Sequence, residues 1–247
     1  MTFEERVISQ SINFTDLEDR IVQYFAANKK DIGDLKITYL ARRFYTYPNT
    51  ITRLCHKLGY TGFADLKSSI KNETIDNQKV GDYGAKELQK NLELISQMPW
   101  ERVLDKLLSA KKINFYSMGQ TAYVTRLIVG NFYALDYKSF FYDYPSDLTH
   151  IIGHESSDLF FLISLSGNKK PLLKLAREIK SHGNCLITLT NLSVNPLAKL
   201  ADERLFCYSP DKRIDDYNVT DKVPVLLVMN ELFKRYAKRL NKEIKDV

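Results

Sequence analysis

A group of polar residues with the chemistry of a phosphate site follows the apolar run at residues 159–163. Ser164 and Ser166 carry hydroxyls that can donate hydrogen bonds to phosphate oxygens, and Gly167 permits a close backbone approach. Lys169 and its neighbour stand near the start of a predicted helix, where the helix dipole disfavours cations, so a bound anion would stabilise them. The alternative is an ordinary serine-capped turn with its lysines in solvent.

A second loop of the same kind follows the apolar stretch at residues 113–117. From about residue 99 onward, apolar strands alternate with amphipathic helices, which predicts a doubly wound α/β domain with a mainly parallel sheet. Ligands of such folds bind at the carboxyl ends of the strands, where helix N-termini present free amides, and both loops belong to that edge. The predicted ligand-binding residues are Ser117, Gly119, Gln120, Thr121, Ser164, Ser166, Gly167, Asn168 and Lys169.

The positive charge of the chain is concentrated in one short segment. Of 247 residues, 36 are Lys or Arg and 30 are Asp or Glu, a formal net charge of +6. Residues 36–71 contain seven of the basic residues and one acid, Asp65, so this segment alone carries +6 and the rest of the chain is neutral. Such a footprint is typical of a surface that binds a polyanion, although a solvated basic face would have the same composition.

Three helices are predicted around this segment. Thr15 and Glu18 form a capping-box pattern at the start of a helix that reaches about residue 30. A second helix is predicted at residues 36–44, and a third at 48–58, because Pro48 suits a first helical turn and Gly59 ends the pattern. Two short helices joined by a tight turn are the arrangement of a helix-turn-helix.

The third predicted helix separates into an apolar and a polar face. Ile51, Leu54, Cys55 and Leu58 form one stripe, so Cys55 is expected to be a core residue. The opposite face carries asparagine and arginine, which can pair with base edges, and threonines and lysine, which can reach phosphates. A surface helix with an ordinary polar face is the alternative. The predicted DNA-binding residues are Arg42, Arg43, Thr46, Tyr47, Asn49, Thr50, Thr52, Arg53, His56 and Lys57.

This stretch resembles the N-terminal module of the RpiR/MurR family of bacterial transcriptional regulators. The family shows an alanine-led second helix, a Ser-Pro-x-Thr-x-x-Arg start to the recognition helix, and a Leu-Gly-aromatic-x-Gly-Phe tail. The matching residues are Ala41, Pro48, Thr50, Arg53, Leu58, Gly59, Tyr60, Gly62 and Phe63. Tyr47 departs from the pattern, because the family has a serine there as helix N-cap and tyrosine cannot cap; either Thr46 caps instead or the phenol contacts the DNA backbone.

The second half of the chain resembles the sugar isomerase (SIS) domain, a phosphosugar-binding module that usually accompanies the RpiR helix-turn-helix. The SIS pattern Ser-x-Ser-Gly-x-Thr matches Ser164, Ser166 and Gly167, but Lys169 replaces the threonine. In the first loop, Thr121 keeps a hydroxyl where the family has serine, and one glycine of the family pattern is absent. Lys169 could bind the phosphate as a point charge or could fill the site. The resemblance implies a sugar phosphate as ligand.

An enzyme of the phosphosugar isomerase type is the main alternative, because SIS domains also occur in isomerases. Such an enzyme needs an acid/base pair, and the candidates are His150, His154 and Glu155. The fused DNA-binding module favours a sensor, which needs binding without turnover, so no catalytic residue is assigned. A carbohydrate-binding adaptor that never meets DNA is disfavoured by the charge of residues 36–71.

The sequence therefore predicts a multi-domain protein, with an all-α helix-turn-helix domain at residues 1–72, a linker at 73–86 and an SIS domain at 87–247. We expect a regulator of carbohydrate genes that binds a palindromic operator as a homodimer or a dimer of dimers. No cofactor or metal is expected. The three cysteines, Cys55, Cys185 and Cys207, are far apart and form no CxxC pair, which argues against a zinc site or a disulfide framework. The lack of an apolar stretch of about 20 residues or a signal-peptide pattern predicts a cytoplasmic protein without membrane contact.

Overall fold

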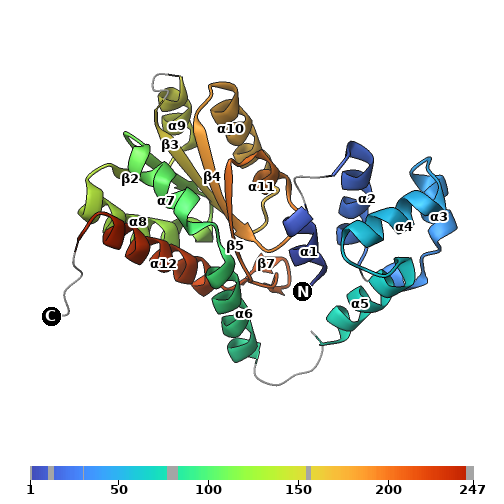
Figure 1. Ribbon diagram of the computed structural model, residues 1–247. Helices are drawn as coiled ribbons and strands as arrows, with labels where there is room; N and C mark the ends of the chain where they lie inside the picture. The colour runs from blue at the N-terminus through green and yellow to red at the C-terminus, as the bar shows by residue number, and fades with distance from the viewer. Residues whose placement is uncertain (1, 11–13, 30, 77–82, 154–156, 243–247) are drawn as a thin grey trace. The chain divides into compact units, whose positions relative to one another are not determined.

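The computed structural model describes residues 2–10, 14–29, 31–76, 83–153 and 157–242. The chain divides into two compact units, Met1–Tyr83 and Gly84–Val247 (Figure 1). The first is helical and the second is built on a parallel sheet, so the predicted fold class is confirmed. Helix α5 continues to Asp76 and α6 begins at Tyr83, within the stretch predicted as linker.

The first unit contains five α-helices and one short 3₁₀ helix in the described residues. They are α1 (Phe3–Gln10), α2 (Asp16–Ala27), η2 (Ile32–Asp34), α3 (Ile37–Arg43), α4 (Pro48–Lys57) and α5 (Phe63–Asp76). The capping box at the start of α2 is confirmed, since Thr15 accepts from the amide of Glu18 while the Glu18 carboxylate accepts from the amide of Thr15. The three helices predicted from the sequence are α2, α3 and α4, whereas α1 and α5 were not anticipated.

One aromatic-rich core holds this helical unit together. The ring of Phe25 on α2 lies 6.4 Å from that of Phe3 on α1 and 6.0 Å from that of Phe63 on α5. Arg6 of α1 donates to the carbonyl oxygens of Leu58 and Gly59, at 3.1 and 2.8 Å. These carbonyls end α4, so α1 stabilises the C-terminal end of that helix.

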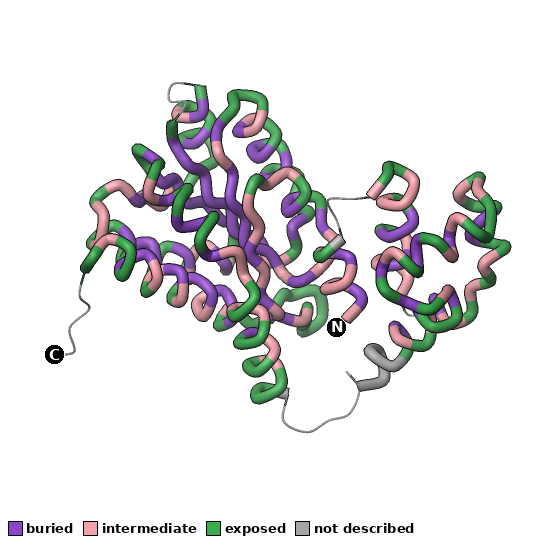
Figure 2. The backbone as a smooth tube through the Cα atoms, in the orientation of Figure 1, coloured by how far each residue is buried: buried purple, intermediate pink, exposed green. Residues whose placement is uncertain are grey.

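The second unit is a doubly wound α/β domain around a five-stranded parallel sheet in the order β2-β1-β3-β4-β5. The strands are β1 (Ile113–Ser117), β2 (Ser139–Tyr142), β3 (Leu159–Ser164), β4 (Cys185–Asn191) and β5 (Glu203–Cys207). The helices are α6 (Tyr83–Gln97), α7 (Trp100–Ser109), α8 (Gln120–Asp136), α9 (Pro145–Ile152), α10 (Lys170–Ser181), α11 (Pro196–Leu200) and α12 (Val223–Arg239). All residues of the central strands β1 and β3 are buried, as a parallel sheet covered on both faces requires (Figure 2).

Alternate residues of each strand serve two separate cores. Phe115 and Phe161 stack with centroids 5.1 Å apart on the face covered by α7, α8 and α12. Phe160 and Leu162 point to the opposite face, which α9, α10 and α11 cover. This alternation fixes the register of the sheet and therefore which loops emerge together at its carboxyl edge.

A small hairpin separates β5 from α12. It consists of β6 (Arg213–Ile214) and β7 (Tyr217–Asn218), paired antiparallel. Asp211 holds its base, because it accepts from the Thr220 hydroxyl at 3.0 Å and from the Asn218 amide at 3.3 Å. We call residues 211–222 the strap. Neither the strap nor α9 is expected from the sequence, since neither has an extended apolar periodicity.

Among the described residues, no helix is both long enough and apolar enough to cross a membrane.

Candidate DNA-binding face and ligand pocket

Helix α4 presents the two faces expected of a recognition helix. Ile51, Leu54 and Cys55 are fully buried against the helical core, and burial raises the pKa of the Cys55 thiol to about 12, which suits the predicted core role. Asn49 and Arg53 are exposed on the opposite side. In the described part of the chain, Arg53 makes no hydrogen bond or ion pair, so its guanidinium is available to a ligand.

The other predicted DNA contacts differ in exposure. Exposed are Arg42, Arg43, Tyr47, Asn49, Arg53 and His56, while Thr46, Thr50, Thr52 and Lys57 are partly buried. Lys57 is already engaged, since its ammonium lies 2.8 Å from the Glu18 carboxylate on α2. Arg43 packs over the ring of Tyr24 at 4.7 Å. Tyr47 occupies the N-cap position without a side-chain hydrogen bond.

The turn between α3 and α4 contains an unusual tyrosine. Tyr45 has a φ of 52°, in the left-handed region, and its side chain is 96% exposed. The turn closes as a helix C-terminus does, with the Thr46 amide donating to the Ala41 carbonyl at 2.8 Å. Glycine adopts this conformation without strain, whereas tyrosine does not.

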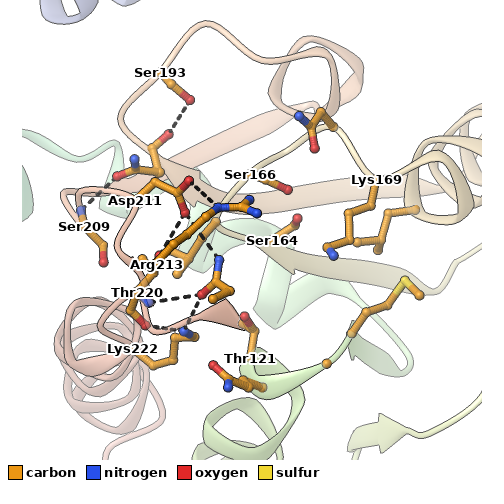
Figure 3. Close-up of a pocket in the computed structure, with 18 residues that line it drawn as sticks. Thr121, Ser164, Ser166, Lys169, Ser193, Ser209, Asp211, Arg213, Thr220 and Lys222 are labelled. Atoms are coloured by element: carbon orange, nitrogen blue, oxygen red, sulfur yellow. Dashed lines mark hydrogen bonds and ion pairs between the residues drawn. The ribbon is translucent and has the colours of Figure 1, made fainter. Parts of the chain in front are cut away.

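The second unit contains a cavity of about 420 Å³ at the carboxyl edge of its sheet (Figure 3). The loops after β1, β3 and β4 and the strap all contribute to it. Its lining is Met118, Gly119, Gln120, Thr121, Ser164, Leu165, Ser166, Asn168, Lys169, Leu172, Asn191, Ser193, Ser209, Asp211, Arg213, Asn218, Thr220 and Lys222. Seven of the nine residues predicted from the sequence are in this lining, so the two predicted loops do converge.

Gly167 is buried in the β3–α10 loop and does not line the cavity. Its φ is +60°, and a Cβ at this position would overlap the side chain of Asn195, with 2.8 Å to the Asn195 Cβ. Asn195 caps α11 by accepting from the Ala198 amide at 2.9 Å, and its own amide donates to the Thr190 hydroxyl at 3.0 Å. The glycine therefore allows the β3–α10 loop to pack against the β4–α11 loop.

Ser117, also predicted to bind the ligand, is 98% buried at the end of β1 and does not line the cavity. Its hydroxyl oxygen makes no hydrogen bond in the described structure. Ser164 is similarly buried, at 5% exposure, but reaches the cavity, and Ser166 and Lys169 are exposed.

Polar cavity-lining residues that were not expected from the sequence come from the strap, from Ser209 before it, and from Asn191 and Ser193 after β4. Asp211 forms an ion pair with Arg213, with 3.2 Å from Oδ2 to Nε. The Lys222 ammonium donates to the Asn218 side chain at 3.3 Å and to the Thr220 carbonyl, and desolvation lowers its pKa. The dense run of polar residues at 209–222 was the available signal, but a two-residue strand has no periodicity to detect.

The structure gives less support to the isomerase alternative than to the sensor. His150 lies exposed on α9 and is absent from the cavity lining, while His154 and Glu155 lie outside the described residues. Within the described ranges, no cluster of three or more His, Cys, Asp or Glu side chains is arranged to hold a metal ion.

A helix-turn-helix unit followed by a doubly wound unit with a polar pocket defines a DNA-binding transcriptional regulator with a ligand-binding domain. Residues 1–77 match the helix-turn-helix domain of the rpiR family and residues 106–234 match the SIS domain. The chain belongs to the RpiR family of helix-turn-helix regulators that carry an SIS domain.

Known proteins align with nearly the whole of this chain. An HTH-type transcriptional regulator of Clostridium perfringens is 25% identical and aligns over 97% of this chain and 93% of its own. GlvR of Bacillus subtilis, also an HTH-type transcriptional regulator, is 23% identical over 96% of each chain. In fold, the chain is similar to the Vibrio vulnificus NanR protein complexed with ManNAc-6P, with a TM-score of 0.59, 21% identity and coverage of 97% and 93%.

Proposed function

We propose that this regulator controls carbohydrate genes and is itself controlled by a sugar phosphate bound in the cavity of the SIS domain. The observation that carries the proposal is the composition of the cavity, in which serine, threonine and asparagine side chains surround Lys169 and Arg213. Hydroxyls and amides suit a polyol, and the cations suit a phosphate ester. The ManNAc-6P complex of a protein with the same fold supports this ligand class.

The phosphate is expected at the β3–α10 loop. Ser164 and Ser166 provide hydroxyls there, and the first turn of α10 provides backbone amides that lack helical partners. Lys169 stands at the N-cap of α10 without a side-chain hydrogen bond. A phosphate would neutralise its unfavourable position next to the positive end of the helix dipole.

Operator binding is assigned to α4, with a homodimer or dimer of dimers on a palindromic site. A single recognition helix contacts too few base pairs to specify one site in a genome, so two copies are needed. The protein acts in the cytoplasm, and the sugar phosphate is bound without turnover, as the naming of its relatives as transcriptional regulators supports. Effector binding changes the operator affinity through the linkage between the two sites.

The test is a thermal-shift screen of the full chain against sugar phosphates, followed by calorimetry on any stabilising compound. Ser166→Ala should weaken binding of that compound about tenfold, because it removes a hydrogen bond to a charged group. Ser109→Ala, an exposed serine on α7 outside the cavity, is the matched control and should bind as the wild type does. Equal ligand affinity in the Ser166 variant would contradict the pocket assignment.

A purified protein that interconverts an aldose phosphate and a ketose phosphate would contradict the sensor proposal and support the isomerase alternative. The same screen provides the substrates for that assay. Loss of the conversion in a Glu155→Gln variant would assign it to this chain instead of a contaminant.

A further inference from the structure

Arg213 has hydrogen-bonding capacity that the protein itself does not use. Its Nε pairs with Asp211 at 3.2 Å, but its two terminal amino groups make no hydrogen bond with any residue that the structure describes. Its side chain is 56% exposed and lines the cavity. A guanidinium held by one edge and open at the other can bind a carboxylate or a phosphate.

Two of the cations that line the cavity lie on opposite sides of the serine loop. In Figure 3, Ser164 and Ser166 project between Lys169 on one side and Arg213 on the other. Lys169 belongs to the loop before α10, whereas Arg213 belongs to the strap. A phosphate bound by the serines and Lys169 therefore leaves Arg213 for a different part of the ligand.

The other two charged residues of the lining, Lys222 and Asp211, are held by contacts within the strap. Lys222 points its ammonium at strap oxygens of Asn218 and Thr220, so it holds the strap together. Asp211 accepts from Arg213, Thr220 and the Asn218 amide. With three cations and one carboxylate, the lining carries a formal charge of +2.

The strap contacts other elements of the second unit both near its hairpin tip and near its base. At the hairpin tip, Tyr217 accepts a hydrogen bond of 3.0 Å from the Gln120 amide at the start of α8. Near the base, the Lys212 ammonium lies 3.0 Å from the Glu87 carboxylate on α6. Arg213 lies between these tethers in the chain, so its backbone is held at the cavity before a ligand binds.

We infer that the ligand is a sugar phosphate with a second anionic group, a carboxylate or another phosphate, which Arg213 binds opposite the first phosphate. The inference rests on the proposed function, because it names the class of sugar phosphate for the same cavity. A volume of about 420 Å³ is within the range of small-molecule sites. The strap thereby favours doubly anionic sugar phosphates over sugars whose only anionic group is one phosphate.

The experiment is calorimetry on the full chain with two matched pairs, at physiological ionic strength to screen long-range attraction. One pair is glucose 6-phosphate and 6-phosphogluconate, and the other is fructose 6-phosphate and fructose 1,6-bisphosphate. The doubly anionic member of at least one pair should bind about tenfold or more tightly than its partner, as expected for one additional charge-assisted bidentate contact.

Three variants test whether Arg213 causes the tighter binding of the doubly anionic ligand. Arg213→Gln should reduce the affinity ratio within the pair to about one or two, and Arg213→Lys should retain part of it, because lysine keeps the charge but not the planar fork. Arg177→Gln, an exposed position on α10 outside the cavity, makes the same charge change and should leave the ratio intact.

The outcomes separate this inference from the proposed function. Equal affinities within both pairs, or a ratio that survives Arg213→Gln, overturn the inference while leaving a sugar phosphate as the ligand. If no sugar phosphate of either kind binds the wild-type protein, the proposed function fails and the inference fails with it.

Discussion

Replacing Gly167 with alanine tests the packing that holds the proposed phosphate loop in place. The change has two costs. The first is the left-handed φ of +60°, which costs an alanine about 1–2 kcal/mol. The second cost comes from overlap with the Asn195 side chain, which must move. Asn195 then loses the hydrogen bond from the Ala198 amide that caps α11, worth about 0.5–2 kcal/mol. It also loses its buried hydrogen bond to Thr190, worth about 1 kcal/mol. Together these costs should lower the free energy of unfolding by about 2.5–5 kcal/mol.

Gly183→Ala is the matched control, because Gly183 also has a positive φ, +73°, but nothing lies within 4 Å of a Cβ placed there. It should cost only about 1–2 kcal/mol. Urea unfolding followed by the fluorescence of Trp100 reports on the second unit alone, since this is the one tryptophan of the chain and is 95% buried there. Equal costs for the two alanines would refute the packing argument, as would a Gly167→Ala cost that does not shrink in an Asn195→Ala background.

Three further predictions concern the helical unit. Arg53→Ala should weaken operator binding by about 1–3 kcal/mol because its free guanidinium faces away from the core; unchanged affinity in a mobility-shift assay would exclude Arg53 from the interface. Tyr45→Gly should raise the free energy of unfolding by about 0.5–1 kcal/mol, since relief of the left-handed strain exceeds the added entropy of the unfolded chain, and a lower stability by circular dichroism would show that the exposed ring packs on something. Burial acts to raise the pKa of the Glu18 carboxyl, but hydrogen bonds from Lys57 and Thr15 outweigh burial and hold that pKa below its ordinary value of 4.5. A lowered carboxyl pKa stabilises the fold above that value and the contribution disappears as pH falls through the folded pKa, so Glu18→Gln should cost about 1 kcal/mol at neutral pH and nothing in strong acid; a cost independent of pH would contradict the ion-pair account.

The elements that the sequence predicted correctly are those with local signals. The Thr15–Glu18 capping box lies within one helical turn, and the apolar stripe of α4 repeats at helical spacing. The central strands β1 and β3 are apolar runs buried on both faces of a parallel sheet, a composition that can be recognised in the sequence. The edge strands β2 and β5 are only partly buried.

The missed elements depend on contacts between distant residues. Helix α1 is held by Arg6, which bonds to carbonyls more than 50 residues away, and no local pattern indicates such a partner. The strap depends on Asp211 and Thr220 meeting across a turn. Gly167 was assigned to the ligand because glycine permits close approach; the structure shows that the close neighbour is Asn195.

The direct test of the account is the effect of the sugar phosphate on operator binding by the full chain. An operator duplex is first selected from a random-sequence library with the wild-type protein. Its affinity is then measured with and without a saturating concentration of the sugar phosphate found by thermal shift. The account predicts a change of about fivefold or more, in either direction, matched by an equal change in sugar affinity when the operator is present. A sugar phosphate that binds the cavity but leaves the operator affinity unchanged would contradict it.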